Sequence, residues 1–290
     1  MGWGLALSAG GLLGAAHLGV LRAFAEWGLR PETLAGASAG GLVAGFLAAG
    51  GSLEDLIAFG QKISDRPLHY LRPRVLSLTA ELLPGDPLPP PDSILDSTPL
   101  VEGIVALCPR ARTTDDWCLP TALTAVDLGA LEAVVFIRPG APPLPLRGRW
   151  RTVTGTDLKL ALQATMAMPG VYSAVRSGEQ FLVDGGLADT LPVDWAAALG
   201  AERVLAVDVA PPTPGVPPRA GLLWSLAQSL AYGTASISAL RRPQAMRVLT
   251  LAPDTRGVGG FEFSAYPRLV EAGYSEAVRR KEEIVSFLAG

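Results

Sequence analysis

Histidine and cysteine are the scarcest chemistry-bearing residues in this sequence, with two of each among 290 residues. Two cysteines, Cys108 and Cys118, are too few for a disulfide scaffold, and we expect free thiols in a reducing compartment. Clusters of His and Cys at ligand spacing are absent, so we expect no metal site. The histidines are His17 and His69. A triad of the α/β-hydrolase type runs serine, acid, histidine along the chain, and no histidine follows residue 69 to act as its base.

Charge is also scarce. Charged residues make up 18% of the chain, and the formal net charge is −3. The sequence therefore has no basic footprint for nucleic acid, and an anionic membrane would not attract it as a whole. Hydrophobic residues make up 49%. A chain of this length and composition can bury a large core, and we expect one domain over residues 1–290.

The first 21 residues contain no Asp, Glu, Lys or Arg. A signal peptide or a membrane span would also be uncharged, but this segment has no basic start and is interrupted by glycines. We interpret it as a buried strand, a loop and a helix. The expected location is the cytoplasm, with a transient peripheral contact at the membrane.

The segment Gly36-Ala37-Ser38-Ala39-Gly40 matches the G-x-S-x-G pattern of a nucleophile elbow. A short apolar approach precedes it, and a helical segment follows it up to Gly50. Small neighbours allow the tight strand-to-helix turn that exposes a serine hydroxyl. In a chain rich in Gly and Ala the same pattern also fits a plain helix start. The motif therefore indicates a nucleophile only if other catalytic residues accompany it.

A carboxylate is the candidate base, because His17 lies in an apolar helical segment and His69 has no other catalytic signal nearby. Residues 181–183 read as a buried strand that delivers Asp184 to a turn at Gly185 and Gly186. Loops at strand ends line the crevice of an α/β protein, and burial would raise the pKa of an aspartate from about 3.9 towards useful values. The alternative is that Asp184 only begins a turn.

Glycines before the first predicted helix supply the third element. The apolar run 5–7 leads into Gly10, Gly11 and Gly14, whose backbone N–H groups would suit an oxyanion or a phosphate. The spacing also resembles a dinucleotide fingerprint in which Ala9 replaces the first glycine, with Glu32 at the distance expected for a ribose contact.

Together these segments resemble the patatin-like phospholipase family, in their order at residues 5–21, 36–40, 166–171 and 184–193. The resemblance implies that Ser38 is the nucleophile and that Asp184 completes a Ser-Asp dyad without histidine. It also implies an oxyanion hole formed by the glycine-rich loop, at the N–H groups of Gly10, Gly11 and Leu12. The motifs are supported by Gly14, Gly36, Gly40, Gly185 and Gly186.

The chain departs from the family pattern at several positions of these motifs. Ala9 stands where the family usually has its first loop glycine, and Leu13 stands where it usually has Arg or Lys. Asp189-Thr190 replaces a frequent pair of asparagines. The backbone donors survive these changes but the positive charge does not, so catalysis is expected to be weaker or differently tuned.

Apolar strand candidates alternate with helical segments, which predicts a three-layer α/β/α sandwich with a mostly parallel central sheet, of the patatin-like form that the resemblance implies. We expect strands near residues 4–8, 33–36, 121–126, 132–138, 180–184, 203–209 and 246–251. We expect helices near residues 13–28, 39–49, 53–64, 97–107, 157–168, 193–199, 222–240 and 267–288. The proline-rich stretches 84–92 and 211–218 predict loops.

Two segments are lid candidates, residues 65–120 and 211–240. Residues 220–240 carry no charge and place apolar side chains at helical spacing. Two interpretations stay open for them: a helix that covers the sheet, or a lid or interfacial surface that admits acyl chains.

The sequence thus predicts a serine acyl hydrolase, of the phospholipase A, lysophospholipase or carboxylesterase type, that cleaves a lipid or long-chain ester through an acyl-enzyme and needs no cofactor. One alternative is an NAD(P)-dependent oxidoreductase that uses the loop from Gly10 to Gly14. Another is a catalytically weakened, lipid-binding relative. The oligomeric state is left open.

Overall fold

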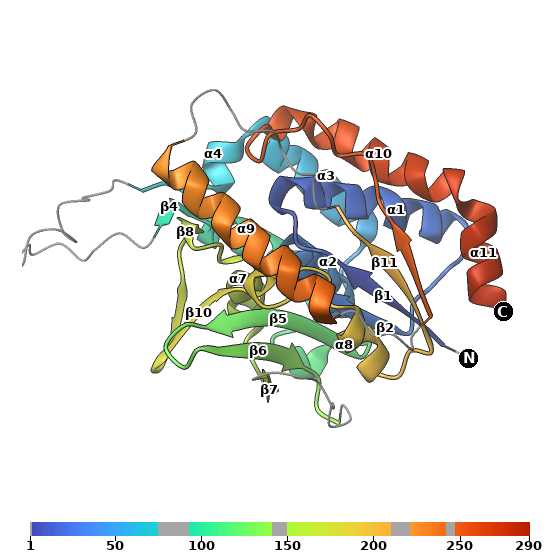
Figure 1. Ribbon diagram of the computed structural model, residues 1–290, viewed down its shortest axis with the longest axis horizontal. Helices are drawn as coiled ribbons and strands as arrows, with labels where there is room; N and C mark the ends of the chain where they lie inside the picture. Colours follow the sequence, from blue (N-terminus) through green and yellow to red (C-terminus); the bar gives the residue numbers. More distant parts are fainter. Residues whose placement is uncertain (1, 75–92, 141–149, 210–220, 242–246) are drawn as a thin grey trace, which may run out of the picture.

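A central β-sheet with helices on both faces organises the chain in the computed structural model, which describes residues 2–74, 93–140, 150–209, 221–241 and 247–290. Figure 1 shows the three layers, and they confirm the predicted α/β/α sandwich. The central sheet of the described residues has nine strands. They are β1 (Trp3–Leu7), β2 (Thr33–Gly36), β5 (Thr121–Asp127), β6 (Glu132–Ile137), β7 (Trp150–Val153), β9 (Val175–Ser177), β10 (Gln180–Asp184), β11 (Arg203–Val207) and β12 (Arg247–Leu251).

The described helices alternate with these strands along much of the chain. The α-helices are α1 (Ala15–Glu26), α2 (Ala39–Ala48), α3 (Leu53–Asp65), α4 (Pro67–Tyr70), α6 (Thr98–Ala106), α7 (Leu158–Met166), α8 (Val193–Ala198), α9 (Leu222–Arg241), α10 (Tyr266–Arg279) and α11 (Lys281–Ala289). Short 3-10 helices are η1 (Gly11–Gly14), η2 (Thr114–Asp116), η3 (Gly185–Leu187) and η4 (Phe263–Ala265).

Strand order explains why the sheet is mostly parallel. The path β12-β11-β1-β2-β5 is parallel throughout, and β10 and β9 then continue it antiparallel. β6 pairs antiparallel with the other edge of β5, and β7 pairs parallel with β6. Parallel neighbours need crossover helices, which the alternating helices provide.

Side chains alternate between the two faces of the sheet, so the sheet separates two hydrophobic cores. Leu5 and Leu7 face the larger core, which is covered by α1, α2, α7 and α10. Alanines face the other core, and neighbouring strands place them side by side in a row: Ala206, Ala6, Ala35 and Ala122. These small residues let α8 approach closely, and its Trp195 is fully buried there.

The structure differs from the expected elements in several places. The short elements α4, β7 and β9 were not predicted. The predicted helix 267–288 is two helices, α10 and α11, because Arg280 between them leaves helical geometry with φ −105° and ψ 16°. A second, three-stranded sheet was not predicted, and its strands are β3 (Arg72–Pro73), β4 (Ser93–Asp96) and β8 (Gly170–Tyr172). The predicted loops 84–92 and 211–218, residue 246, and the parts of the two lid candidates at 75–92 and 211–220 lie outside the described residues.

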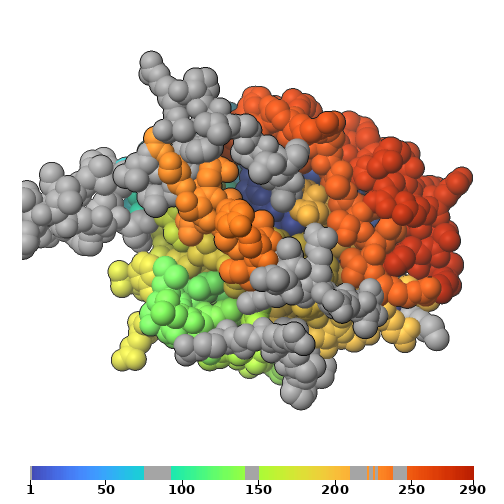
Figure 2. All heavy atoms as spheres, viewed as in Figure 1, coloured from blue at the N-terminus to red at the C-terminus, as the bar shows by residue number. Residues whose placement is uncertain are grey.

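Helix α9 crosses one side of the molecule in Figure 1 and lies on the surface in Figure 2. It contacts η3, directly after Asp184. Leu230, Tyr232 and Ile237 are 49%, 77% and 39% exposed, so this helix leaves much apolar surface in solvent. None of the described helices is both long and apolar enough to span a bilayer. Whether α9 is a lid stays a prediction.

Candidate active site

The site forms where two strands end opposite each other on one edge of β5. β6 occupies the other edge of β5, so β2 and β10 share this one. β2 runs along it until Gly36 lies opposite Leu123, and β10 runs in the opposite direction until Asp184 lies opposite Ala125. One residue, Thr124, separates these two positions, a span of about 7 Å. The segments that follow β2 and β10 must therefore meet.

Ser38 follows β2 in a strained turn. Its φ of 54° and ψ of −123° lie where non-glycine residues are rare. Gly40 permits the turn, because a Cβ at this position would lie 2.6 Å from the carbonyl oxygen of Ser8. The N–H of Ser38 donates to Thr165 Oγ1 of α7 at 3.2 Å. The predicted elbow geometry is thus present, and Ser38 remains 7% exposed.

Asp184 accepts two hydrogen bonds. Ser38 Oγ donates to Asp184 Oδ2 at 2.6 Å, and the N–H of Gly186 donates to Oδ1 at 2.7 Å. The N–H of Asp184 itself donates to the carbonyl of Ala167. Burial raises the pKa of Asp184 to about 6, and the bonds from Ser38 and Gly186 oppose this rise. Near neutral pH the carboxylate is ionised and can accept a proton from the serine.

The glycine-rich loop follows β1 and reaches the same place. Gly11, Leu12 and Gly14 line the pocket that contains Ser38, whereas Gly10 does not line it and lies against Val209. Within the described ranges, the N–H groups of Gly10, Gly11 and Leu12 have no hydrogen-bond acceptor. The two that belong to residues lining the pocket, Gly11 and Leu12, are therefore available to a ligand there.

Leu13, which replaces the basic residue of the family pattern, is 5% exposed and belongs to the larger core. It does not line the pocket. A cation in this rotamer would be buried among apolar side chains, so the loop offers backbone donors without a positive charge.

The histidines occupy structural positions. His17 is fully buried in α1, and its Nε2 lies 2.9 Å from the carbonyl oxygen of Ser8, so Nε2 carries the proton and donates. Burial lowers the pKa of His17 to about 4, although the bond to Ser8 opposes this effect. His69 is exposed and stacks edge-on against Tyr70. Neither histidine lines the pocket of Ser38.

Glu32 does not lie where the dinucleotide interpretation placed it. Its N–H donates to Trp3, and its side chain lies beside Gly2, at the amino end of β1. The glycine-rich loop leaves the carboxyl end of the same strand, about 13 Å away. Glu32 therefore cannot contact the ribose of a nucleotide bound at this loop.

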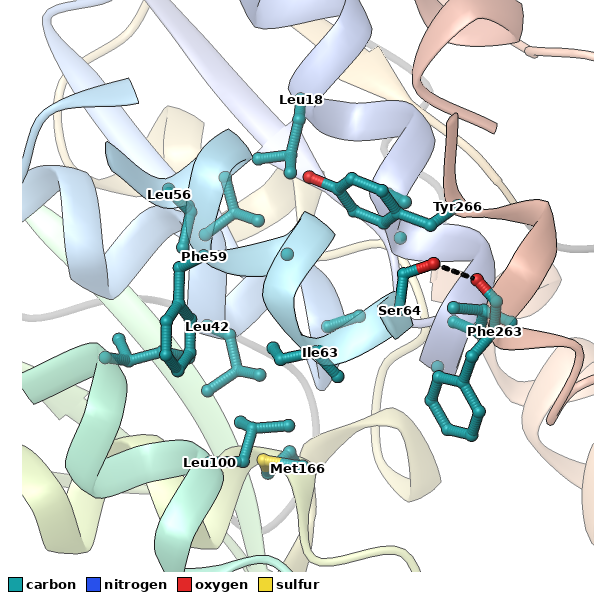
Figure 3. Close-up of a pocket in the computed structure, with 18 of the residues that line it drawn as sticks. Leu18, Leu42, Leu56, Phe59, Ile63, Ser64, Leu100, Met166, Phe263 and Tyr266 are labelled. Atoms are coloured by element: carbon teal, nitrogen blue, oxygen red, sulfur yellow. Dashed lines mark hydrogen bonds between the residues drawn. The ribbon is translucent and has the colours of Figure 1, made fainter. Parts of the chain in front are cut away.

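An apolar pocket of about 150 Å³ opens at Ser38 and extends between α2 and α3. Figure 3 shows Leu42, Leu56, Phe59, Leu100, Met166 and Tyr266 around it. Tyr172 also lines it, and burial together with the charge of Asp184 raises the pKa of this phenol to about 12. The sequence did not predict that residues of α3 and α10 form walls of this pocket, or that Thr165 accepts a hydrogen bond from Ser38.

A comparison with sequence models of protein families finds one family over most of the chain. The sequence model of the family described as patatin-like phospholipase matches residues 5–197. An uncharacterised NTE family protein of Mycobacterium tuberculosis is 29% identical over 205 residues, which are 71% of this chain and 48% of that protein. Lysophospholipase NTE1 of Mycosarcoma maydis is 27% identical over 209 residues, 72% of this chain and 10% of that protein.

Among solved structures, the crystal structure of VipD from Legionella pneumophila aligns with a TM-score of 0.48 at 14% identity. The alignment covers 96% of this chain and 66% of VipD. As for the sequence relatives, the chain spans about half the length of the mycobacterial protein and a small part of the fungal one.

Proposed function

Since the chain belongs to the patatin-like phospholipase family, we propose that it is a serine acyl hydrolase that cleaves lipid-like carboxylic esters through a Ser-Asp dyad. One observation carries the proposal: Ser38 Oγ lies 2.6 Å from Asp184 Oδ2 at a strained elbow that opens into an apolar pocket. A nucleophile within hydrogen-bond reach of a base is the arrangement that covalent catalysis needs.

In the acylation step Asp184 accepts the proton of the Ser38 hydroxyl while Oγ attacks the ester carbonyl carbon. The carbonyl oxygen becomes an oxyanion, which the N–H groups of Gly10, Gly11 and Leu12 stabilise. The tetrahedral intermediate collapses, the bond to the alcohol oxygen breaks, and Asp184 returns the proton to the leaving alcohol. The acyl group stays on Ser38 as an ester.

Deacylation repeats the sequence with water. Asp184 accepts a proton from water, the hydroxide attacks the acyl carbon, and the second intermediate releases the fatty acid as Oγ regains the proton. The pKa of about 6 suits both steps, because the carboxylate is ionised at neutral pH and still basic enough to take a proton in the transition state.

The pocket supports an acyl chain as the recognised part of the substrate. Its walls are mostly apolar side chains, and they begin at the nucleophile. The fungal relative named lysophospholipase adds support for a lysophospholipid or another single-chain lipid ester. The single-domain organisation, the lids at 65–120 and 211–240, and transient contact with a membrane surface remain part of the proposal.

Labelling with a fluorophosphonate probe tests the function directly. The probe should label the wild type and leave Ser38→Ala unlabelled, and Ser38→Ala should lose hydrolysis of p-nitrophenyl esters by several orders of magnitude. Loss of one buried oxygen should leave the fold intact, which circular dichroism can verify. Undiminished turnover by a folded Ser38→Ala protein would overturn the proposal, and lipid binding without labelling would favour the catalytically weakened relative.

A further inference from the structure

Two aromatic rings that line the pocket each rest against a glycine of a neighbouring helix. The ring of Phe59, on α3, lies over Gly103 of α6, where a Cβ would be 2.7 Å from Cε2 of the ring. The ring of Tyr266, at the start of α10, lies over Gly60 of α3, where a Cβ would be 2.5 Å from Cε2. Any side chain at either glycine would overlap the ring.

Neighbouring groups also hold both rings in place. Phe59 packs edge-on against Tyr70 with ring centres 5.1 Å apart, and the hydroxyl of Tyr266 donates to the carbonyl of Ile57 at 2.8 Å. Both rings are less than 10% exposed. Protein interiors are close-packed, so a displaced ring moves towards the space that is empty. Here that space is the cavity, which Figure 3 shows with both rings on its wall.

The backbone that carries Tyr266 is held firmly in place. Gly19 of α1 and Gly273 of α10 let the two helices cross in backbone contact, because a Cβ at either position would overlap the opposite chain. This crossing fixes α10, which begins with Tyr266. A change at Gly60 is therefore expected to move the ring of Tyr266 rather than its helix.

We propose that the pairs Gly103–Phe59 and Gly60–Tyr266 determine the width of the acyl pocket, and through it the longest acyl chain that the enzyme accepts. The inference rests on the proposed function and deepens it, because it assigns substrate specificity to four residues outside the catalytic machinery. A methyl group at either glycine would push the ring into the cavity, and the ring would then occupy space that part of the acyl chain needs.

The test compares wild type, Gly60→Ala and Gly103→Ala on p-nitrophenyl esters from butyrate to palmitate. For each methylene of the acyl chain that the narrowed pocket excludes, we expect kcat/KM to fall about fourfold. The palmitate-to-butyrate ratio should therefore fall at least about fourfold in each variant, while butyrate turnover changes less than about twofold. Gly260→Ala is the matched control, because a Cβ there meets no neighbour and the residue lies in an exposed turn outside the pocket and both lid candidates.

A second variant guards against a loss of folding. Phe59→Leu should raise the palmitate-to-butyrate ratio, and the double variant Gly103→Ala with Phe59→Leu should return it to the wild-type value. An unchanged ratio in folded Gly60→Ala and Gly103→Ala proteins would overturn the proposal. An unchanged ratio in Phe59→Leu would also count against it.

Binding separates this inference from the proposed function. The same variants in the Ser38→Ala background can be titrated with the fluorescent fatty acid cis-parinaric acid, which needs no hydrolysis. Weaker binding by both glycine variants would support the pocket assignment even if the wild type hydrolysed no ester. Equal binding by all variants would refute the assignment and leave the hydrolase proposal standing.

Discussion

Replacing Asp184 by Asn should stabilise the protein at neutral pH while abolishing its activity. Asp184 is 6% exposed, and burial raises its pKa from 3.8 to about 6. The folded state therefore binds a proton at pH values where the unfolded chain has already lost it. Stability from this group is fully present below pH 3.8 and is lost as the pH rises through 6. Asparagine has no charge to bury, so this loss disappears.

The magnitude follows from the two pKa values. One pH unit of difference between them corresponds to about 1.4 kcal/mol, so burial of Asp184 costs about 3 kcal/mol of unfolding free energy at pH 8 and about half of that at pH 5. Asparagine keeps both contacts, because its Oδ1 can accept from Gly186 and its NH₂ can donate to Ser38 Oγ. We expect Asp184→Asn to gain most of these amounts.

Urea unfolding of both proteins from pH 5 to pH 8 measures the gain. The difference between the two proteins is the informative quantity, because His17 titrates in the opposite sense in both. Its pKa falls to about 4 on folding, so its contribution to stability is lost as the pH falls below 6.5. Ser38→Ala is the control, since it is equally inactive but keeps the carboxylate. The reasoning fails if Asp184→Asn is no more stable than wild type at pH 8, or if its advantage does not shrink towards pH 5.

Three further results are expected. The kcat/KM for a p-nitrophenyl ester should fall about tenfold per pH unit below about pH 6 and level off above it, because only ionised Asp184 can act as base; a flat profile from pH 4.5 to 8 would contradict that role. Thr165→Val should lower kcat by about tenfold with little change in KM, whereas Thr165→Ser, which keeps the acceptor for the N–H of Ser38, should retain activity. His17→Gln should keep most activity because its amide can still donate to Ser8, whereas His17→Leu should lose about 1 kcal/mol of unfolding free energy; inactivity of a folded His17→Gln protein would show that the imidazole has a chemical role.

The elements that the sequence predicted well are those with a strong local signal. β1, β2, β5, β10 and β11 are apolar runs bounded by Gly, Asp or Pro, and each appears within a few residues of its expected place. The elbow and the Asp-Gly-Gly turn carry their own backbone requirements in their glycines. The approach of Ser38 to Asp184 was predictable only through the family resemblance, since 146 residues separate them.

What the sequence did not predict depends on contacts between distant segments. β3 has two residues, too few for any alternation, and it forms only because β4 lies beside it. Thr165 looks like an ordinary helical threonine until the fold places it over the N–H of Ser38. The role of Gly60 depends on Tyr266, about two hundred positions later. The helix and strand propensities of single residues carry no information about contacts between such distant segments.

In the proposed mechanism, the arrangement around β5 is what allows Ser38 to be activated without histidine. In a triad, an imidazole takes the serine proton and later gives it to the leaving group, while the acid orients and stabilises the imidazole. Here β2 and β10 end on the same edge of one strand with a single residue between them, so the acid lies in hydrogen-bond contact with the nucleophile. Burial at this junction then raises the pKa of Asp184 to about 6, close to that of an unperturbed imidazole. In the proposed mechanism, the strand geometry therefore supplies both the proximity and the basicity that a histidine would otherwise contribute.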